Sequence, residues 1–432
     1  MTLFTASTKL PRRSLLALII VICAVSYQFS QHLIGTRIST PCLIQDLLQF
    51  WTRDANAFLN THQGAANALI ILNSLFGDLS ILMLLGVTLW RASVRSFVPL
   101  FVFIFFRQAL QLLITFPPMP GMIFHDPGFP SLFVNYASDT SFYFSAFVGT
   151  NILSALERSY WKIRWVNGVG VLIVLFVAIT DILLRTHYTA DLYTSMIVAL
   201  FAFYFTQNLS ARIDHYLQKF GKLTRPILIL VLCGCLGAYL TAQHYINMKP
   251  LSSCGIVDAV QNFFYPINQW MTITPSIGNA FLIFMNAIQD AIFFYILIYT
   301  IWTRKLVLYI TFALFLITRQ TLQMLVHLPL PPHTIWHYPG FPSLFQNYNI
   351  TDDLYFSGHT GTSLIFALHL AEYGRRWLTL TGFVTFAFMA LFVIIMQIHY
   401  TMDVFSAILT VICISTLAHR WAPSVSRWLA RI

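Results

Sequence analysis

The chain has 432 residues, of which 57% are hydrophobic and only 9% are charged. An ordinary soluble domain carries roughly 25% charged residues, so this chain cannot cover itself with a polar surface, and a soluble globular protein is excluded. The formal net charge of +10 would suit a nucleic-acid partner. However, the basic residues fall in alternate connections between apolar runs, a pattern that indicates membrane topology and no nucleic-acid partner.

Apolar runs recur from one end of the chain to the other. Each is long enough to cross a hydrocarbon layer of ~30 Å as a helix. They predict an all-α, polytopic membrane protein with about twelve transmembrane helices. Their approximate positions are 14–32, 67–90, 96–116, 141–156, 165–185, 188–206, 226–246, 278–302, 306–328, 354–372, 377–397 and 400–418.

Basic residues precede the first predicted span and follow every second span after it. By the positive-inside rule, both termini are therefore predicted to be cytoplasmic. The opposite connections hold few basic residues and several acids, among them Asp46 and Asp258. They are expected to face the periplasm, the lumen or the exterior. The basic clusters include Lys9, Arg12 and Arg13; Arg91 and Arg95; Arg158, Lys162 and Arg164; Arg212, Lys219, Lys222 and Arg225; Arg304 and Lys305; Arg375 and Arg376; and Arg420, Arg427 and Arg431.

Motifs repeat along the chain at a constant offset of 212 residues. Pro-Gly-Phe-Pro-Ser-Leu-Phe occurs at 127–133 and 339–345, and His-Tyr-Thr-x-Asp at 187–191 and 399–403. The same offset pairs Asp78 with Asp290, Arg107 with Arg319 and Cys42 with Cys254. It predicts two parallel tandem six-helix copies, 1–212 and 213–432. The first span matches an internal one, so it is expected to be a retained helix and not a signal peptide.

Two motifs of the second copy open spans at the same membrane face. Ser357-Gly358-His359-Thr360 opens the tenth span, and His399-Tyr400-Thr401-Met402-Asp403 opens the twelfth. The partial positive charge of two helix N-termini at one face favours a bound phosphate. Ser357 is a good N-cap residue, and with Gly358 it leaves backbone N–H groups open to a ligand.

The two histidines of these motifs can divide the work of phosphoryl transfer. His399 and Asp403 lie at i and i+4, so the carboxylate can fix the imidazole tautomer and leave the other ring nitrogen to attack phosphorus. His359 would protonate the departing oxygen, a contribution worth roughly 10²–10⁴-fold. The pair predicts a catalytic site.

The two motifs, together with the Leu-Pro-x-Pro-Pro loop at 328–332, resemble the sphingomyelin-synthase-related branch of the type 2 phosphatidic acid phosphatase (PAP2) superfamily. The resemblance implies that His399 forms a phosphohistidine with Asp403 as its partner. It also implies that His359 acts as acid and then base, at the non-cytoplasmic face. The chain departs from the branch at 351–354, where it reads Thr-Asp-Asp-Leu, and has no clear Lys-x₆-Arg-Pro motif.

The first copy lacks the proposed acid. Phe147 stands where the offset places His359, although His187 and Asp191 are present. Phenylalanine cannot transfer a proton, so this copy is predicted to be catalytically silent.

The remaining candidates concern the bound headgroup. Thr360 and Tyr400 are predicted to contact it, and Arg319 either binds phosphate or pairs with Asp290, since a charge within a span needs a cavity or a partner. His333 and His337 could touch the headgroup, but the sequence has no Cys, Asp or Glu near them that would complete a set of metal ligands. No metal and no cofactor are expected.

The leading prediction is an enzyme that transfers a phosphate-containing headgroup from a phospholipid donor to a lipid alcohol, such as ceramide or diacylglycerol, or to water. The alternatives are a twelve-helix transporter with its substrate between the halves, and a lipid-binding protein without turnover. Either a bacterial cytoplasmic membrane or a eukaryotic endomembrane is compatible with the sequence. Cys42 and Cys254 lie on the outer face, where a disulfide could clamp the two copies.

Overall fold

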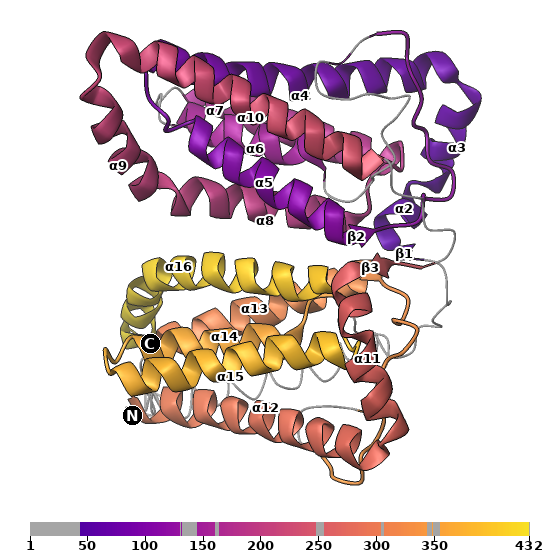
Figure 1. The fold of residues 1–432 in the computed structure, drawn as a ribbon, viewed down its shortest axis with the longest axis vertical. Coiled ribbons are helices and arrows are strands. Elements are labelled where there is room, and N and C mark those ends of the chain that lie inside the picture. The colour runs from indigo at the N-terminus through magenta and orange to yellow at the C-terminus, as the bar shows by residue number, and fades with distance from the viewer. Residues whose placement is uncertain are drawn as a thin grey trace, which may run out of the picture. The chain divides into compact units, whose positions relative to one another are not determined.

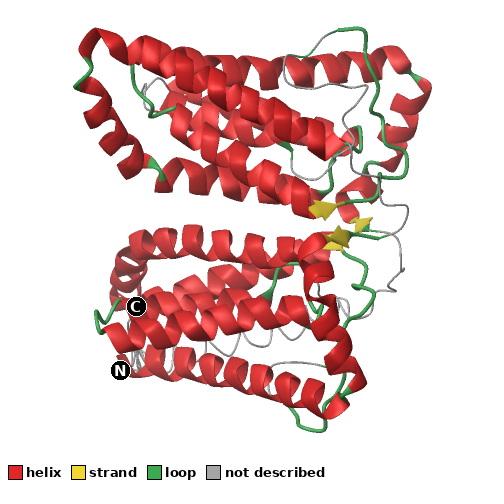
Figure 2. Ribbon diagram, in the orientation of Figure 1, coloured by secondary structure: helices red, strands yellow, loops and turns green. Residues whose placement is uncertain are grey.

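The computed structural model describes residues 44–129, 131, 145–159, 164–247, 255–303, 306–343, 348 and 355–431. Apart from four two-residue strands, the regular structure of these residues is helical (Figures 1 and 2). They form two compact units, which we call the N-terminal unit (Thr40–Val260) and the C-terminal unit (Gln261–Ile432). Cys42 and Cys254 lie outside the described residues, so their disulfide stays a prediction.

The N-terminal unit is a helix bundle with two short helices before its first long one. Its elements are β1 (Gln45–Asp46), α2 (Leu47–Trp51), α3 (Arg53–Thr61), α4 (Gln63–Arg91), α5 (Phe97–Leu113), β2 (Ile114–Thr115), α6 (Ala146–Ser159), α7 (Arg164–Leu183), α8 (Thr189–Phe205), α9 (Gln207–Gln218), the 3₁₀ turn η1 (Gly221–Leu223), α10 (Thr224–Asn247) and β3 (Val257–Asp258).

The C-terminal unit repeats much of this order. It contains α11 (Ala259–Ile273), α12 (Pro275–Thr303), α13 (Leu306–Leu325), β4 (Val326–His327), α14 (Gly358–Ala371), α15 (Arg376–Ile395) and α16 (Thr401–Arg431). In each unit a helix of 14 residues, α6 or α14, lies at the centre of the bundle. α14 packs against α12, α13, α15 and α16, and α6 packs against α4, α5, α7 and α8.

Among the described residues, seven helices are long and apolar enough to cross a membrane, or eight if α8 and α9, which bend by 48° at their junction, form one span. The chain is therefore an integral multi-pass membrane protein. Eleven of the twelve predicted runs coincide with a described helix, and the run at 14–32 lies outside the described residues. α6 and α14 have only 14 residues each, which span about 21 Å at 1.5 Å per residue.

One helix of the predicted second copy, α10, packs within the N-terminal unit. By the offset, α10 is the first span of the second copy, yet it packs against α5 and α4 of the N-terminal unit (Figure 1). β3 pairs antiparallel with β2, with Ile114 opposite Asp258. The compact units thus divide at Val260, whereas the predicted domains divide at 212.

Contacts within the two units recur at the 212-residue offset. Asn56 donates to the carbonyl oxygens of Gly121 and Leu183 at 3.0 and 2.8 Å, and Asn268 donates to those of His333 and Ile395 at 3.1 and 3.0 Å. These hydrogen bonds from an asparagine side chain fix α3 in one unit and α11 in the other. Each helix is thereby held to the end of the helix that comes before the histidine motif. Equal local sequence has therefore produced equal local geometry.

Candidate active site

The first motif of the candidate site lies at the start of α16. A tight turn with Gln397 in the left-handed region (φ 54°) leads the chain from α15 into His399. Asp403 lies in the first turn of α16, and its Oδ2 accepts the backbone N–H of Tyr400 at 3.0 Å. The carboxylate therefore caps its own helix and satisfies a donor that a helix N-terminus leaves open.

The His399 ring lies beside this carboxylate. Nδ1 of His399 is 3.9 Å from Oδ2 of Asp403, and both side chains are buried. Gln261 Nε2 donates to the His399 carbonyl at 3.0 Å, which ties the motif to α11. Because Nδ1 faces the carboxylate, Nε2 is the ring nitrogen directed elsewhere.

The second motif lies at the start of α14. Ser357 Oγ accepts the N–H of Thr360 at 3.3 Å, as an N-cap does. Phe356, just before it, has φ 78°, a conformation that costs a bulky residue free energy and concentrates at functional sites. Arg319 Nε donates to the Phe356 carbonyl at 3.1 Å, so the buried guanidinium stabilises this strained turn.

A glycine at 358 is what lets the Arg319 guanidinium approach the start of α14. A Cβ atom at this position would lie 3.1 Å from Nε and 3.3 Å from Cζ of Arg319. The positive charge of Arg319 is thereby added to the N-terminus of α14, where helix geometry already favours an anion.

The two helix starts meet. The backbone N–H of Ser357 donates to the Asp403 carbonyl at 3.3 Å, and His399 and Arg319 both lie within electrostatic range of His359. His359 and His399 are each less than 5% exposed. Two imidazoles and a guanidinium therefore share one buried region at two helix N-termini.

Residues that the sequence did not single out hold His359. Its Nε2 is 3.1 Å from Asn286 Oδ1, and Asn286 Nδ2 donates to the Tyr348 hydroxyl at 2.8 Å. The Trp336 ring lies 6.1 Å from the His359 ring between centroids. The sequence could have pointed to Asn286, because an asparagine within an apolar span needs a hydrogen-bond partner.

The other predicted contacts are distributed around this region. Thr360 is fully buried, and its hydroxyl has no hydrogen-bond partner among the described residues. The Tyr400 hydroxyl donates to the Pro329 carbonyl at 3.1 Å and so holds the 328–332 loop. Asp290 Oδ1 accepts from Ser343 at 2.9 Å. His337 contacts Asn279, and the His333 ring lies 4.7 Å from the Tyr265 ring between centroids, tilted by 45°. No group of three His, Cys, Asp or Glu in the described chain could hold a metal.

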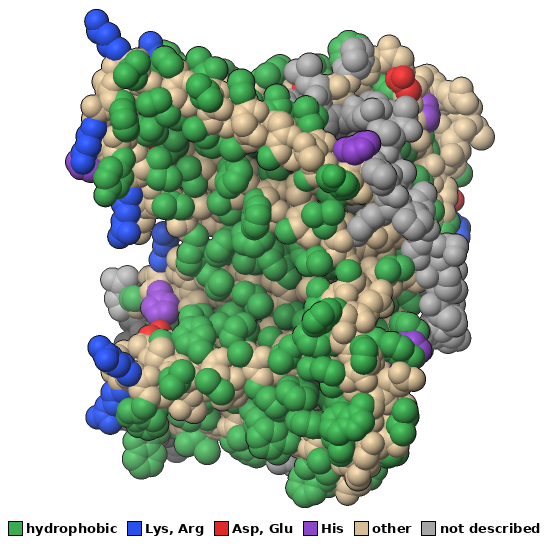
Figure 3. Space-filling view, in the orientation of Figure 1, with side chains coloured by type: hydrophobic (Ala, Val, Ile, Leu, Met, Phe, Trp, Pro, Cys, Tyr) green, Lys and Arg blue, Asp and Glu red, His purple; other side chains and the backbone are tan. Residues whose placement is uncertain are grey.

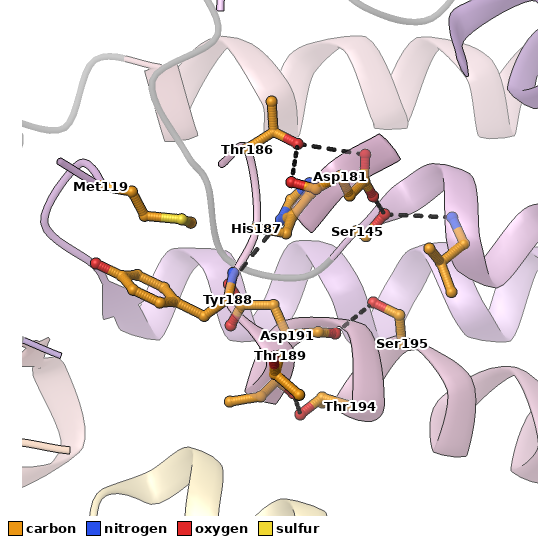
Figure 4. A network of polar contacts seen from close by, with 12 residues as sticks. Met119, Ser145, Asp181, Thr186, His187, Tyr188, Thr189, Asp191, Thr194 and Ser195 are labelled. Carbon is orange, nitrogen blue, oxygen red and sulfur yellow. Dashed lines mark hydrogen bonds and ion pairs between the residues drawn. The ribbon is translucent and has the colours of Figure 1, made fainter. Parts of the chain in front are cut away.

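The N-terminal unit keeps the carboxylate–histidine pair (Figure 4). His187 Nδ1 lies 4.0 Å from Asp191 Oδ2, which also accepts the N–H of Tyr188 at 3.0 Å. Gln49 Nε2 donates to the His187 carbonyl at 3.4 Å. These three contacts match those of His399, Asp403 and Gln261 at the 212-residue offset.

The place of the second histidine is filled differently. The Phe147 ring packs directly on Gly77, where a Cβ would overlap it. At the position that matches Gly77, the C-terminal unit has Gln289, which hydrogen-bonds with Thr362 at 2.9 Å. The absence of a side chain at Gly77 is what makes room for the phenylalanine ring.

A buried carboxylate forms a separate network beside His187 (Figure 4). Asp181 accepts from Asn73 and from Ser145, both at 2.7 Å, and from Thr186 at 3.2 Å. The C-terminal unit has Met285, Val393 and Ile398 at the positions that match Asn73, Asp181 and Thr186. This network therefore belongs to the N-terminal unit alone.

A comparison with known families matches residues 352–420 to the model described as PAP2 superfamily C-terminal. The matched segment contains α14, α15 and the first part of α16, and hence His359, His399 and Asp403. The match supports membership of the PAP2 superfamily and a phosphatase-type enzyme acting on lipids at a coarse level. No curated protein and no solved structure matched the chain.

Proposed function

We propose that this membrane protein transfers the phosphate-containing headgroup of a phospholipid to a lipid alcohol or to water, with chemistry confined to the C-terminal unit. The observation that carries the proposal is the junction of α14 and α16. The hydrogen bond from Ser357 to Asp403 joins the starts of the two helices that carry His359 and His399.

In the first step, Nε2 of His399 attacks phosphorus. A phosphorus–nitrogen bond forms, and the phosphorus–oxygen bond to the departing lipid alcohol breaks. His359 gives its proton to that oxygen. Asp403, 3.9 Å from Nδ1 of His399, stabilises the positive charge that the ring acquires.

In the second step, the hydroxyl of a lipid alcohol or of water attacks the same phosphorus. His359 now takes the proton of the attacking hydroxyl, and the phosphorus–nitrogen bond breaks. His399 returns to its starting state. With a lipid alcohol as acceptor the product is a new phospholipid, and with water it is a water-soluble phosphate. Two displacements at phosphorus give net retention of configuration.

The surroundings suit a phosphate ester. The N-terminus of α14, the Arg319 guanidinium against Gly358 and the buried Thr360 hydroxyl supply donors and positive potential. Asn286 keeps the His359 ring in a fixed orientation. Trp336 and Tyr348, whose ring centroids are 5.3 Å apart, lie beside His359 where a headgroup would pass.

The proposal also includes the origin and orientation of the chain. Contacts repeated at the 212-residue offset favour a tandem duplication of a sphingomyelin-synthase-like unit whose first copy became silent. Arg375 and Arg376 flank the start of α15, and His399 follows its end. Within each unit, most of the Lys and Arg side chains visible in Figure 3 lie on its left side. Under the positive-inside rule, this distribution supports a site at the non-cytoplasmic face.

The test is incubation of the purified protein with phospholipids labelled in the headgroup phosphate, with and without ceramide or diacylglycerol. We expect label in a new lipid when an alcohol is present, and in a water-soluble phosphate when it is absent. Acid-labile, base-stable label should be recovered on the peptide containing His399, most readily in His359→Ala. Inversion at a chiral phosphorus, or label on another residue, would contradict the double displacement.

A further inference from the structure

One helix of the N-terminal unit has no counterpart among the described helices of the C-terminal unit. α4, α6, α8 and α10 pack against α5. Their counterparts at the 212-residue offset are α12, α14, α16 and the predicted span 14–32, which lies outside the described residues. The first three of these pack against α13, the counterpart of α5. The repeat therefore predicts that 14–32 takes the place beside α13 that α10 takes beside α5.

The predicted span 14–32 keeps the residues that α10 turns towards α5. Cys235 and Tyr239 line the cavity between α10 and α5, and Gln243 hydrogen-bonds with α5. These three residues are four apart, so they share one side of the helix. The same residue types stand at the matching positions of the first span, which are Cys23, Tyr27 and Gln31.

The side of α13 that would receive this span is apolar where the matching side of α5 is apolar. The cavity beside α10 is lined from α5 by Leu100, Phe101, Ile104 and Phe105. The matching residues of α13 are Phe312, Ala313, Leu316 and Ile317. The repeat thus supplies both surfaces of a helix–helix contact, one on 14–32 and one on α13.

A polar contact also joins α10 to α5. Gln243 Oε1 accepts from Gln108 Nε2 at 3.1 Å and from Arg107 Nη1 at 3.5 Å, and both donor residues are buried. One amide oxygen can accept two hydrogen bonds, so a single glutamine orients the guanidinium and the neighbouring amide together. Arg319 and Gln320 stand at the matching positions of α13.

We propose that the span 14–32 packs against α13 and that Gln31 accepts hydrogen bonds from Arg319 and Gln320. Arg319 Nε already donates to the turn before α14, so the second contact fixes the guanidinium at the N-terminus of this helix. Gln31 is thus a positioning residue for the candidate active site, supplied by the copy that the sequence predicts to be silent. Its effect on turnover rests on the proposed function, whereas the packing of the span does not.

Thiol crosslinking tests the packing in the full-length protein in nanodiscs, after the six native cysteines have been replaced by alanine. Gln31→Cys with Gln320→Cys should be joined within one chain by a short bis-methanethiosulfonate reagent. Gln243→Cys with Gln108→Cys is the positive control, because these side chains are in contact, and it also verifies that the cysteine-free protein folds. Gln31→Cys with Gln108→Cys should not be joined.

Activity then tests the positioning, in the chain with its native cysteines. Gln31→Met should raise KM for the labelled phospholipid about tenfold, since one hydrogen bond to a charged group is lost. It should leave kcat nearly unchanged, because Arg319 would bind substrate and transition state alike. Gln243→Met removes the matching contact of the N-terminal unit and should leave KM unchanged. A merely structural role would instead lower kcat in both variants through loss of folded protein.

The packing is contradicted if positions 31 and 320 are not joined while the positive control is, if position 31 is joined to 108, or if the bridge links two chains and doubles the mass. The positioning role is contradicted if Gln31→Met and Gln243→Met have equal KM values. Absence of turnover in the unsubstituted protein would contradict the proposed function, and the crosslink would still decide where the first span packs.

Discussion

The starts of α8 and α16 are built almost alike, yet only one of them adjoins a second histidine. In both, an Asp side chain accepts a backbone N–H at 3.0 Å and lies about 4 Å from a His ring. The carboxylate therefore serves first as a helix cap. A His-x₃-Asp pair by itself identifies a structural element, and it becomes a candidate for catalysis only where His359 and Asn286 accompany it.

The difference between the two units is concentrated beside this shared element. Phe147 and Gly77 stand at the positions that match His359 and Gln289, and Asp181 and Asn73 at those that match Val393 and Met285. Where His359 has no counterpart, the neighbouring side chains also differ and fit the phenylalanine. The comparison teaches that the same histidine–carboxylate frame can be built with or without a second histidine beside it.

The largest effect that would sharpen this comparison is on turnover. His399→Ala should lower kcat by about 10⁴-fold or more, because the nucleophile is lost. His187→Ala should leave kcat unchanged. Both variants are measured by release of labelled headgroup phosphate in detergent micelles. A comparable loss in His187→Ala would mean that the two units contribute to one reaction.

The second comparison separates the cap from the charge. In Asp403→Asn, an amide oxygen can still accept the Tyr400 N–H, so the fold should persist while the negative charge beside His399 is lost. Turnover should fall by on the order of 10³–10⁴-fold. Asp191→Asn is the matched control and should retain full activity. Thermal unfolding of both variants tests whether the helix caps survive. Normal turnover by Asp403→Asn would mean that this carboxylate only caps the helix and has no part in catalysis.

A smaller effect is expected where Phe147 meets Gly77. In Gly77→Ala the new methyl group overlaps the ring, and such overpacking costs about 1–3 kcal/mol. Gly86→Ala, in the same helix, meets nothing within 4 Å and should not destabilise the protein. The midpoints of thermal unfolding in one detergent compare the two. Adding Phe147→Ala to Gly77→Ala should recover stability, because the smaller side chain leaves room for the methyl group. If stability is not recovered, overlap with the Phe147 ring is not the cause of the loss.

The smallest net effect concerns the Asp181 network. Asp181→Val leaves Asn73 and Ser145 without their acceptor and should cost about 1–3 kcal/mol. The double variant Asp181→Val with Asn73→Met has the residues of the C-terminal unit at these two positions and should lose less stability than the single variant, because Asn73 and its acceptor are both replaced by apolar groups. Additive losses in the double variant would show that the two side chains are not coupled.

Some features of this protein follow from the sequence alone. The length and spacing of the apolar runs predicted an all-helical membrane chain, since a helix that faces lipid must be apolar over its whole length. Eleven of the twelve runs overlap a described helix, and the family match falls on the segment that carries the histidine motifs. These are local properties, readable without knowing which helices touch.

Tertiary structure decided the rest. That Asn286 holds His359, that Arg319 supports the turn at Phe356 and that α10 packs with the N-terminal unit all depend on contacts between helices distant in sequence. Apolar periodicity predicts that a helix buries one side. Because lipid and the protein interior are similarly apolar, the pattern does not determine which other helix that side packs against. Shape and hydrogen bonding between helices make that choice.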